Sequence, residues 1–128
     1  MKQIILILTM VALGVGFALS QQKKGREVTI SGEVIDIQCY VSGAMGKGAG
    51  ADHKECARDC AKGGIPLGIL EDKTGTIYNV GQSKTAMKGA NEMLMEYIAE
   101  KVTVTGRLVE KGGIKLILVS KVAKFASI

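Results

Sequence analysis

Two kinds of hydrophobic spacing divide this chain into elements. Apolar residues recur at every second position in five segments, which predicts β-strands at residues 27–39, 65–70, 76–80, 101–110 and 114–122. Residues 53–62 have a helical composition and end at a Gly-Gly pair, and residues 84–100 carry apolar residues at helical spacing. Residues 41–52, which are rich in glycine, are predicted to form a flexible loop.

The first predicted strand changes phase near its middle. Apolar residues up to Val34 occupy one face of the strand, and those from Ile35 to Cys39 occupy the other. Gly32 lies close to the change. A phase change beside a glycine predicts a bulge or a sharp bend, which lets one strand pair in two sheets.

The order of these elements predicts the fold class. A long bent strand, an insertion, a hairpin, a helix and a second hairpin follow one another in a five-stranded OB-type barrel. We therefore expect a mainly β fold with two helices, in the form of an OB-like barrel. A small mixed α+β sandwich of the same elements is the alternative. In the barrel, the insertion at residues 39–64 is the loop between the first two strands, a position that this fold commonly uses for binding.

The first 20 residues are typical of a secretory signal peptide. Lys2 precedes an apolar run at residues 4–19, and Ala18 and Ser20 are the small residues expected before a cleavage site after Ser20. We expect a linker at residues 21–26, a single domain at residues 27–128, a periplasmic or secreted location and no stable membrane insertion after cleavage. An uncleaved anchor is the alternative, because the apolar run comes close to the roughly 17 to 25 residues that span a bilayer.

Charge and aromatic content argue against a nucleic-acid partner. Cleavage removes one of the 17 basic residues and leaves the 12 acidic residues, so the formal charge falls from +5 to +4, without a basic stripe. Single-strand binding by OB barrels uses aromatic stacking. The expected mature chain has no Trp, and its aromatic residues are Tyr40, Tyr78, Tyr97 and Phe125.

The three cysteines and the single histidine of the chain fall inside one short segment. Thiolate sulfur and imidazole nitrogen are donors that Zn²⁺ binds, and thiolates also suit Cu(I). On a helix at ~100° per residue, His53, Cys56 and Cys60 project from one face, within an arc of about 60°. Cys39, which arrives from the strand, completes a Cys3His set. The sequence therefore predicts a metal site at Cys39, His53, Cys56 and Cys60.

The span from His53 to Cys60 is the demanding part of this prediction. The two residues would be ~10 Å apart along a regular helix, near the limit that one ion can bridge. The distance shortens if the backbone at His53 turns inward ahead of the helix. Asp52 or Asp59 is expected to orient the histidine.

Both the metal and the redox state stay open at this point. Zn²⁺ suits a closed Cys3His set, and Cu(I) suits thiolates with Met45 in the adjacent loop. A type I blue-copper centre needs two histidines and is excluded. In an oxidising compartment, Cys39 can instead pair with one of the other cysteines and leave a free thiol.

These alternatives define two functions. The first is an exported metal-binding domain with a structural or carrier role, which works with an envelope redox or metal-handling protein. The second is a disulfide-stabilised interaction module with an exchange-capable thiol. We find no catalytic set of residues and expect no enzymatic activity.

The same segment carries a family resemblance. The chain is similar to a largely uncharacterised group of exported bacterial small domains with an OB-like barrel and the signature C-Y…D-H-x-x-C-A-x-x-C-A…G-x-P-L-G-I-L. The signature corresponds here to residues 39–40, 52–61 and 64–70, and the resemblance covers about residues 28–122. It implies an envelope-located domain with a metal or redox site at the three cysteines and His53, and it implies no particular reaction.

Overall fold

The computed structural model describes residues 25–82 and 90–126 of the chain. The predicted signal peptide, the linker up to residue 24 and the first part of the second predicted helix, residues 84–89, lie outside the described residues.

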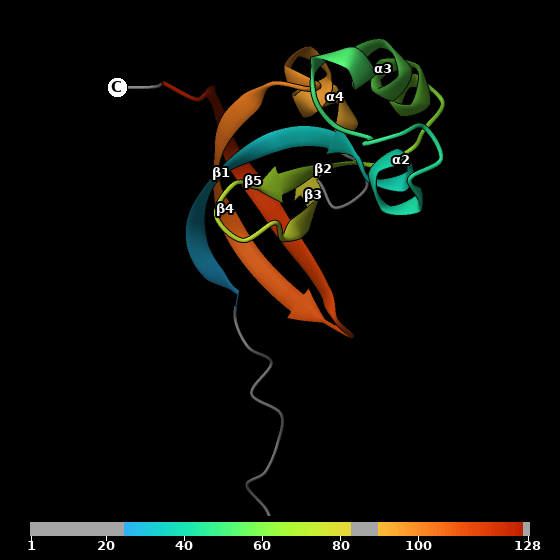
Figure 1. Ribbon diagram of the computed structural model, residues 1–128. Coiled ribbons are helices and arrows are strands. Elements are labelled where there is room, and N and C mark those ends of the chain that lie inside the picture. Colours follow the sequence, from blue (N-terminus) through green and yellow to red (C-terminus); the bar gives the residue numbers. More distant parts are fainter. Residues whose placement is uncertain (1–24, 83–89, 127–128) are drawn as a thin grey trace, which may run out of the picture.

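Five β-strands form a closed barrel (Figure 1). They are β1 (Arg26–Asp36), β2 (Leu67–Glu71), β3 (Ile77–Gln82), β4 (Lys101–Lys111) and β5 (Ile114–Lys124). Around the barrel the order is β1-β2-β3-β5-β4, β4 pairs with β1, and all pairs are antiparallel except β3 with β5. The closed barrel is consistent with the predicted OB-like fold and excludes the α+β sandwich.

β1 pairs with two neighbours along its length, as its phase change predicts. Its first part, Arg26 to Glu33, pairs with β4, and its last part, Gly32 to Asp36, pairs with β2. Gly32 lies where the two pairings overlap, and a Cβ atom there would lie 2.2 Å from the carbonyl oxygen of Leu70. The glycine therefore allows the close backbone approach that this part of the barrel requires.

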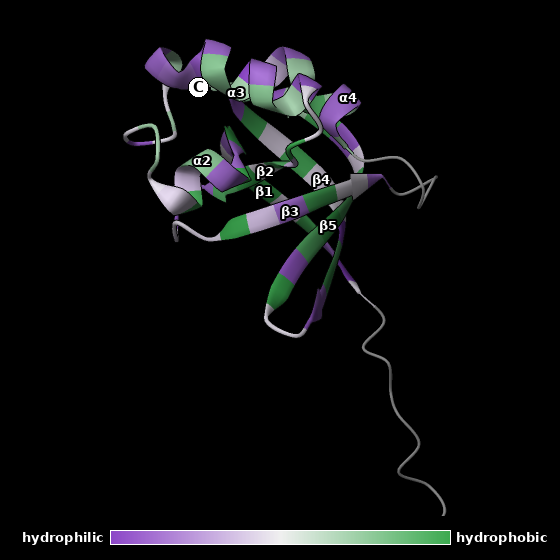
Figure 2. Ribbon diagram, turned by 90° about the vertical axis from the view of Figure 1, so that its right-hand side faces the viewer, coloured by the Kyte–Doolittle hydropathy of each residue, from purple (hydrophilic) through white to green (hydrophobic). Residues whose placement is uncertain are grey.

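Alternating side chains of the strands build one core inside the barrel. The bands of apolar and polar residues along the strands are visible in Figure 2, and in β4 every second residue from Val102 to Leu108 is buried. Leu94 and Ile98 reach the same core from the segment before β4, and both are fully buried. The core therefore joins the barrel to the segment that covers one of its ends.

The predicted end of the first strand is wrong, because β1 ends at Asp36 and not at Cys39. The next residues form a short helix, α2 (Ile37–Ser42). The carboxylate of Asp36 accepts a hydrogen bond from the N–H of Cys39 at 3.0 Å, and Gly43 ends the helix in the left-handed region with φ of 65°. The β-branched Ile37 favours a strand, but this local cap outweighs that preference.

The two predicted helices differ in outcome. A 3₁₀ turn, η1 (Ala51–His53), leads into α3 (Lys54–Lys62), which agrees with the helix expected at residues 53–62. Of the second predicted helix, residues 84–100, the structure describes residues 90–100, and among these only α4 (Asn91–Leu94) and the 3₁₀ turn η2 (Met95–Tyr97) are helical. Ile98 adopts an extended ψ of 130° and forms a bridge to Val34 of β1, so barrel closure ends the helix early.

Asn91 joins three segments above the barrel. Its Nδ2 donates hydrogen bonds to the carbonyl oxygens of Ala61 at 3.1 Å and Ile65 at 2.7 Å, and its Oδ1 accepts one from the N–H of Leu67 at 2.9 Å. The end of α3 and the start of β2 are thus tied to α4 by one side chain.

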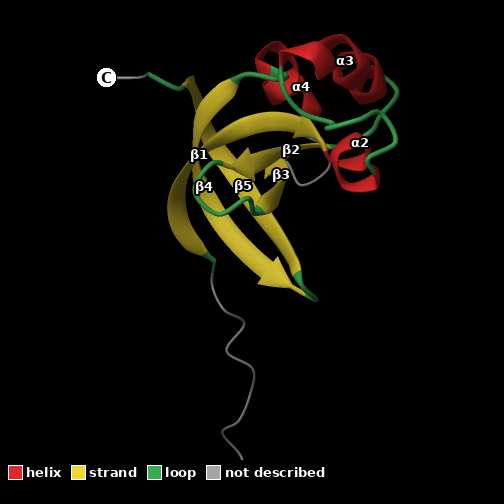
Figure 3. Cartoon of the chain, in the orientation of Figure 1, coloured by secondary structure: helices red, strands yellow, loops and turns green. Residues whose placement is uncertain are grey.

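The helices gather at one end of the barrel. α2, α3 and α4 lie together there, and the turn between β4 and β5 lies at the other end (Figure 3). No helix in residues 25–82 or 90–126 is long and apolar enough to cross a membrane.

Candidate metal centre

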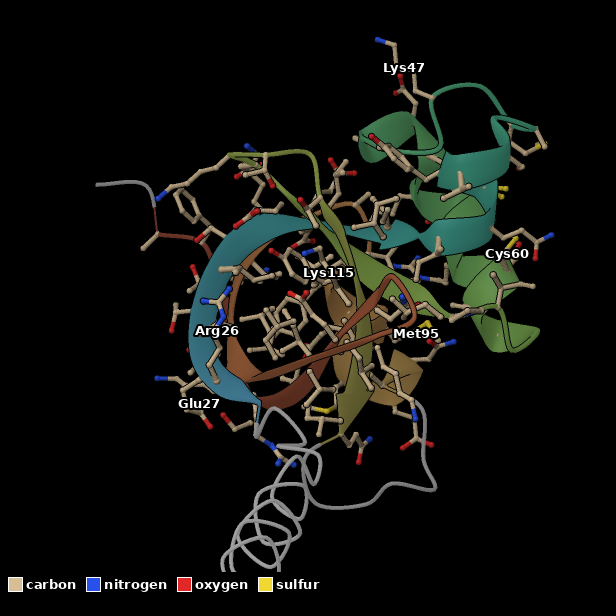
Figure 4. The ribbon with its side chains drawn as sticks, turned by 90° about the horizontal axis from the view of Figure 1, so that it is seen from below. Arg26, Glu27, Lys47, Cys60, Met95 and Lys115 are labelled. Carbon is tan, nitrogen blue, oxygen red and sulfur yellow. The ribbon has the colours of Figure 1, made fainter. Side chains whose placement is uncertain are left out.

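Three cysteine side chains meet between α2 and α3. Cys39 belongs to α2, and Cys56 and Cys60 lie one turn apart on α3. The three sulfur atoms all lie within 4.8 Å of one another, and all three cysteines are free. Cys39 is buried, whereas Cys56 and Cys60 are partly exposed. Figure 4 shows Cys60 on the helices beside the barrel, away from the barrel mouth.

This spacing is close to that of a coordinated set of thiolates. A Zn–S bond is about 2.3 Å long, so two thiolates on one tetrahedral ion lie about 3.8 Å apart. The three sulfurs lie within 4.8 Å of one another, so they need to come closer by no more than about 1 Å to reach this spacing. The cysteine cluster, Cys39, Cys56 and Cys60, can therefore hold a thiophilic metal ion.

The glycine-rich segment after α2 returns the chain to α3. Gly48 has φ of 64°, and a Cβ atom there would lie 2.5 Å from the Cα of Tyr40, so the segment packs on the backbone of α2. Farther along, the N–H of Gly50 donates a hydrogen bond to the carboxylate of Glu33 on β1. The segment predicted as a flexible loop is thus tied to α2 and to the barrel.

Small side chains hold α3 against the barrel. Ala57 and Ala61 are buried and belong to the main core, which orients the neighbouring Cys56 and Cys60. At the start of the helix, Lys54 forms a 3.0 Å salt bridge with Glu100, just before β4. Both ends of α3 are therefore fixed, one by this ion pair and the other by the Asn91 hydrogen bonds.

Asp36 is the residue at the cluster that the sequence analysis missed. Its side chain is fully buried. One carboxylate oxygen, Oδ1, caps α2 by accepting the Cys39 N–H, and the other, Oδ2, has no hydrogen-bond partner among the described residues. An aspartate three residues before Cys39 has the spacing of an N-cap, and this signal was available in the sequence. The β-branched residues that follow concealed it.

The Asp36 carboxylate affects the thiols beside it. The Asp36 carboxylate, which favours the protonated thiol, together with burial and the neighbouring Cys39, raises the pKa of Cys60 to about 12. Burial is the main cause that raises the pKa of Cys39, and the charge of Asp36 adds to it. Both thiols are therefore protonated at neutral pH without a cation, and a metal ion must displace their protons.

His53 lies at the end of η1, directly before α3, and is buried. Its Nε2 atom has no hydrogen-bond partner among the described residues. The group of donor atoms within 4.8 Å comprises the three sulfurs and does not include His53. The structure therefore brings three of the four predicted ligands together, and binding of the same ion by His53 stays a prediction.

The other residues considered from the sequence lie at the surface. Asp52 and Asp59 are exposed, and Asp59 pairs with Lys62 at 3.2 Å. Met45 is also exposed, at 59%.

Comparisons of the chain with protein-family models, with curated proteins and with solved structures found no match.

Proposed function

We propose that this protein is an exported domain that binds one thiophilic metal ion, Zn²⁺ or Cu(I), through Cys39, Cys56 and Cys60. The observation that carries the proposal is the meeting of three free sulfurs, from two different helices, within 4.8 Å of one another. Export rests on the signal-like sequence of the first 20 residues.

A carrier role fits the position of the cluster better than a structural role. The barrel is closed, and its core is made of apolar residues that include none of the three cysteines. Three sulfur donors leave a tetrahedral ion with one open position, and two of the three thiols are partly exposed. An ion at this site is thus accessible to exchange, and its loss leaves the barrel core intact.

His53 is the natural fourth ligand in this proposal. Its buried Nε2 has no partner, and the residue precedes α3 directly. Binding of the ion by His53 would require the imidazole to come closer to the cluster, because it lies outside the group of donor atoms within 4.8 Å of one another. Binding of His53 would close the coordination shell, and its departure would open it.

The same proximity supports a second function, thiol–disulfide exchange. Two of the three thiols can be oxidised by a disulfide of a partner protein, which takes up the two electrons and two protons and becomes a dithiol. The product would be a disulfide between α2 and α3, with one free thiol remaining.

Metal analysis of the full chain, purified from the cell envelope without oxidation, separates the two functions. The metal proposal expects about one ion per chain, and near-complete loss of the ion in each of the variants Cys39→Ser, Cys56→Ser and Cys60→Ser. His53→Ala should lower the affinity if the imidazole is a ligand. Protein without stoichiometric metal, but with a Cys39 disulfide in peptide mass spectrometry, would reject the metal proposal and support exchange.

A further inference from the structure

The buried carboxylate of Asp36 is only partly explained by its role as a helix cap. One oxygen, Oδ1, accepts the N–H of Cys39 at 3.0 Å, which is the whole of the capping interaction. Serine or asparagine caps a helix as well as aspartate does. The second oxygen and the negative charge are therefore in excess of what α2 requires.

Among the described residues, this excess charge has no cationic partner. Asp36 is 0% exposed, and within residues 25–82 and 90–126 no Lys or Arg forms a salt bridge with it. Its Oδ2 is buried without a hydrogen bond of normal geometry. A buried carboxylate is costly unless a cation or several donors compensate it.

The groups that face the carboxylate are the thiols of the cysteine cluster. Asp36 interacts with the side chains of Cys39 and Cys60. Asp36 is not a member of the group of donor atoms that all lie within 4.8 Å of one another. It is therefore a neighbour of two of the three thiols and not a fourth member of the cluster. A metal ion held by the cluster would therefore lie close to Asp36 and supply the cation that the carboxylate lacks.

We infer that Asp36 sets the charge preference of the site and biases it toward a divalent ion of the Zn²⁺ class over Cu(I). This inference rests on the proposed metal function. Three thiolates and the carboxylate carry four negative charges; a divalent ion leaves two of them uncompensated, and Cu(I) leaves three. Beside a fully buried carboxylate, each uncompensated charge is unfavourable. In this arrangement Asp36 acts on the ion through its charge and is not a ligand.

The variant Asp36→Asn separates charge from capping. Asparagine keeps the side-chain oxygen that accepts the Cys39 N–H and has the same shape, but it lacks the negative charge. Asp59→Asn is the matched control, because Asp59 is an exposed residue of α3 that pairs with Lys62. Both variants remove one negative charge from the full chain.

The experiment measures Zn²⁺ and Cu(I) affinities of wild type and both variants by competition with chromophoric chelators, under anaerobic reducing conditions. The ratio of the Zn²⁺ to the Cu(I) association constant should fall by about a hundredfold in Asp36→Asn. Zn²⁺ carries one more positive charge than Cu(I), and a hundredfold is the attraction of that charge to the Asp36 carboxylate at ~6 Å and an effective dielectric constant of about 20. In Asp59→Asn the ratio should change by less than about threefold, because that charge is solvated.

Three outcomes overturn the inference. An unchanged ratio in Asp36→Asn would show that Asp36 has no part in ion preference. Equal losses of both affinities, with a lower melting temperature of the metal-free variant, would reduce Asp36 to a structural cap. If the wild-type chain binds neither ion, the proposed metal function itself fails, and that result is distinct from an unchanged ratio.

Discussion

Asn91→Ala is the sharpest test of how the helical end is attached to the barrel. Asn91 makes three hydrogen bonds, of 3.1, 2.7 and 2.9 Å, to the end of α3 and the start of β2. A hydrogen bond of this kind contributes about 1 kcal/mol to stability, so the loss of all three amounts to about 3 kcal/mol. Asn91 is half-buried, and water can replace some of the lost partners, so we expect about 2 to 3 kcal/mol.

Urea denaturation followed by far-UV circular dichroism measures this loss. The chain contains no Trp, so tyrosine fluorescence is the second probe. The melting temperature should fall by about 8 to 12 °C, since 1 kcal/mol corresponds to about 4 °C or more in a domain of this size. Asp at the same position keeps the acceptor for Leu67 but places a carboxylate against the carbonyl oxygens of Ala61 and Ile65. Asn91→Asp should therefore be at least as unstable as Asn91→Ala.

Asn79→Ala is the control for this prediction. Asn79 is also half-buried and lies in β3, but its Nδ2 makes one long hydrogen bond, of 3.4 Å, to the carbonyl oxygen of Lys115. Its loss should cost no more than about 1 kcal/mol. If Asn91→Ala destabilises the protein no more than Asn79→Ala does, the proposed role of Asn91 in holding α3 is wrong.

Three further predictions follow from contacts elsewhere in the structure. Gly32→Ala places a Cβ atom 2.2 Å from a carbonyl oxygen of β2, so it should lower the free energy of unfolding by about 3 kcal/mol or more, and near-normal stability in urea would contradict this close approach. Hydrogen bonds from Lys54 and Lys124 lower the pKa of Glu100, so their contribution to stability is present above the unfolded-state pKa of about 4.3 and is lost as pH falls through the folded-state pKa. Glu100→Gln should therefore weaken the decrease of the melting temperature between pH 6 and pH 3, and an unchanged decrease would refute this role. Because the pKa of Cys60 is raised to about 12, Zn²⁺ must displace its proton, and the apparent affinity should rise about tenfold or more per pH unit from pH 6 to 8 in chelator competition corrected for chelator protonation. A flat profile would mean that binding displaces no thiol proton, which would contradict thiolate coordination.

The strands were predictable because one face of each is buried in the barrel. In β4 and β5, alternate apolar residues fill the core, and the glycines between them mark the turn. The bend of β1 was also predictable, since the phase change and Gly32 occur together. The short α4 was not predictable, because its end depends on the contact of Ile98 with Val34, residues far apart in the sequence.

The candidate site was predicted in its ligands more than in its geometry. The spacing of Cys56 and Cys60 on a helix placed two sulfurs on one face, as the structure confirms. Cys39 was expected on a strand, because the propensity of its neighbours concealed the N-cap at Asp36. The burial of Asp36 arises from packing across the barrel end, which no local pattern reveals.

Closure of the barrel limits how a partner can approach the protein. Proteins with an open sheet often bind a peptide as an additional strand along a free edge. In the described part of this chain each strand has two partners, and only short stretches, such as residues 26–31 of β1 and residues 121–124 of β5, are paired on one side alone. Strand addition by a partner is therefore confined to these short stretches, because no strand presents an edge along its whole length. In the proposed carrier function, we expect a partner that takes an ion from the cysteine cluster to recognise side chains of α2, α3 and the glycine-rich segment between them.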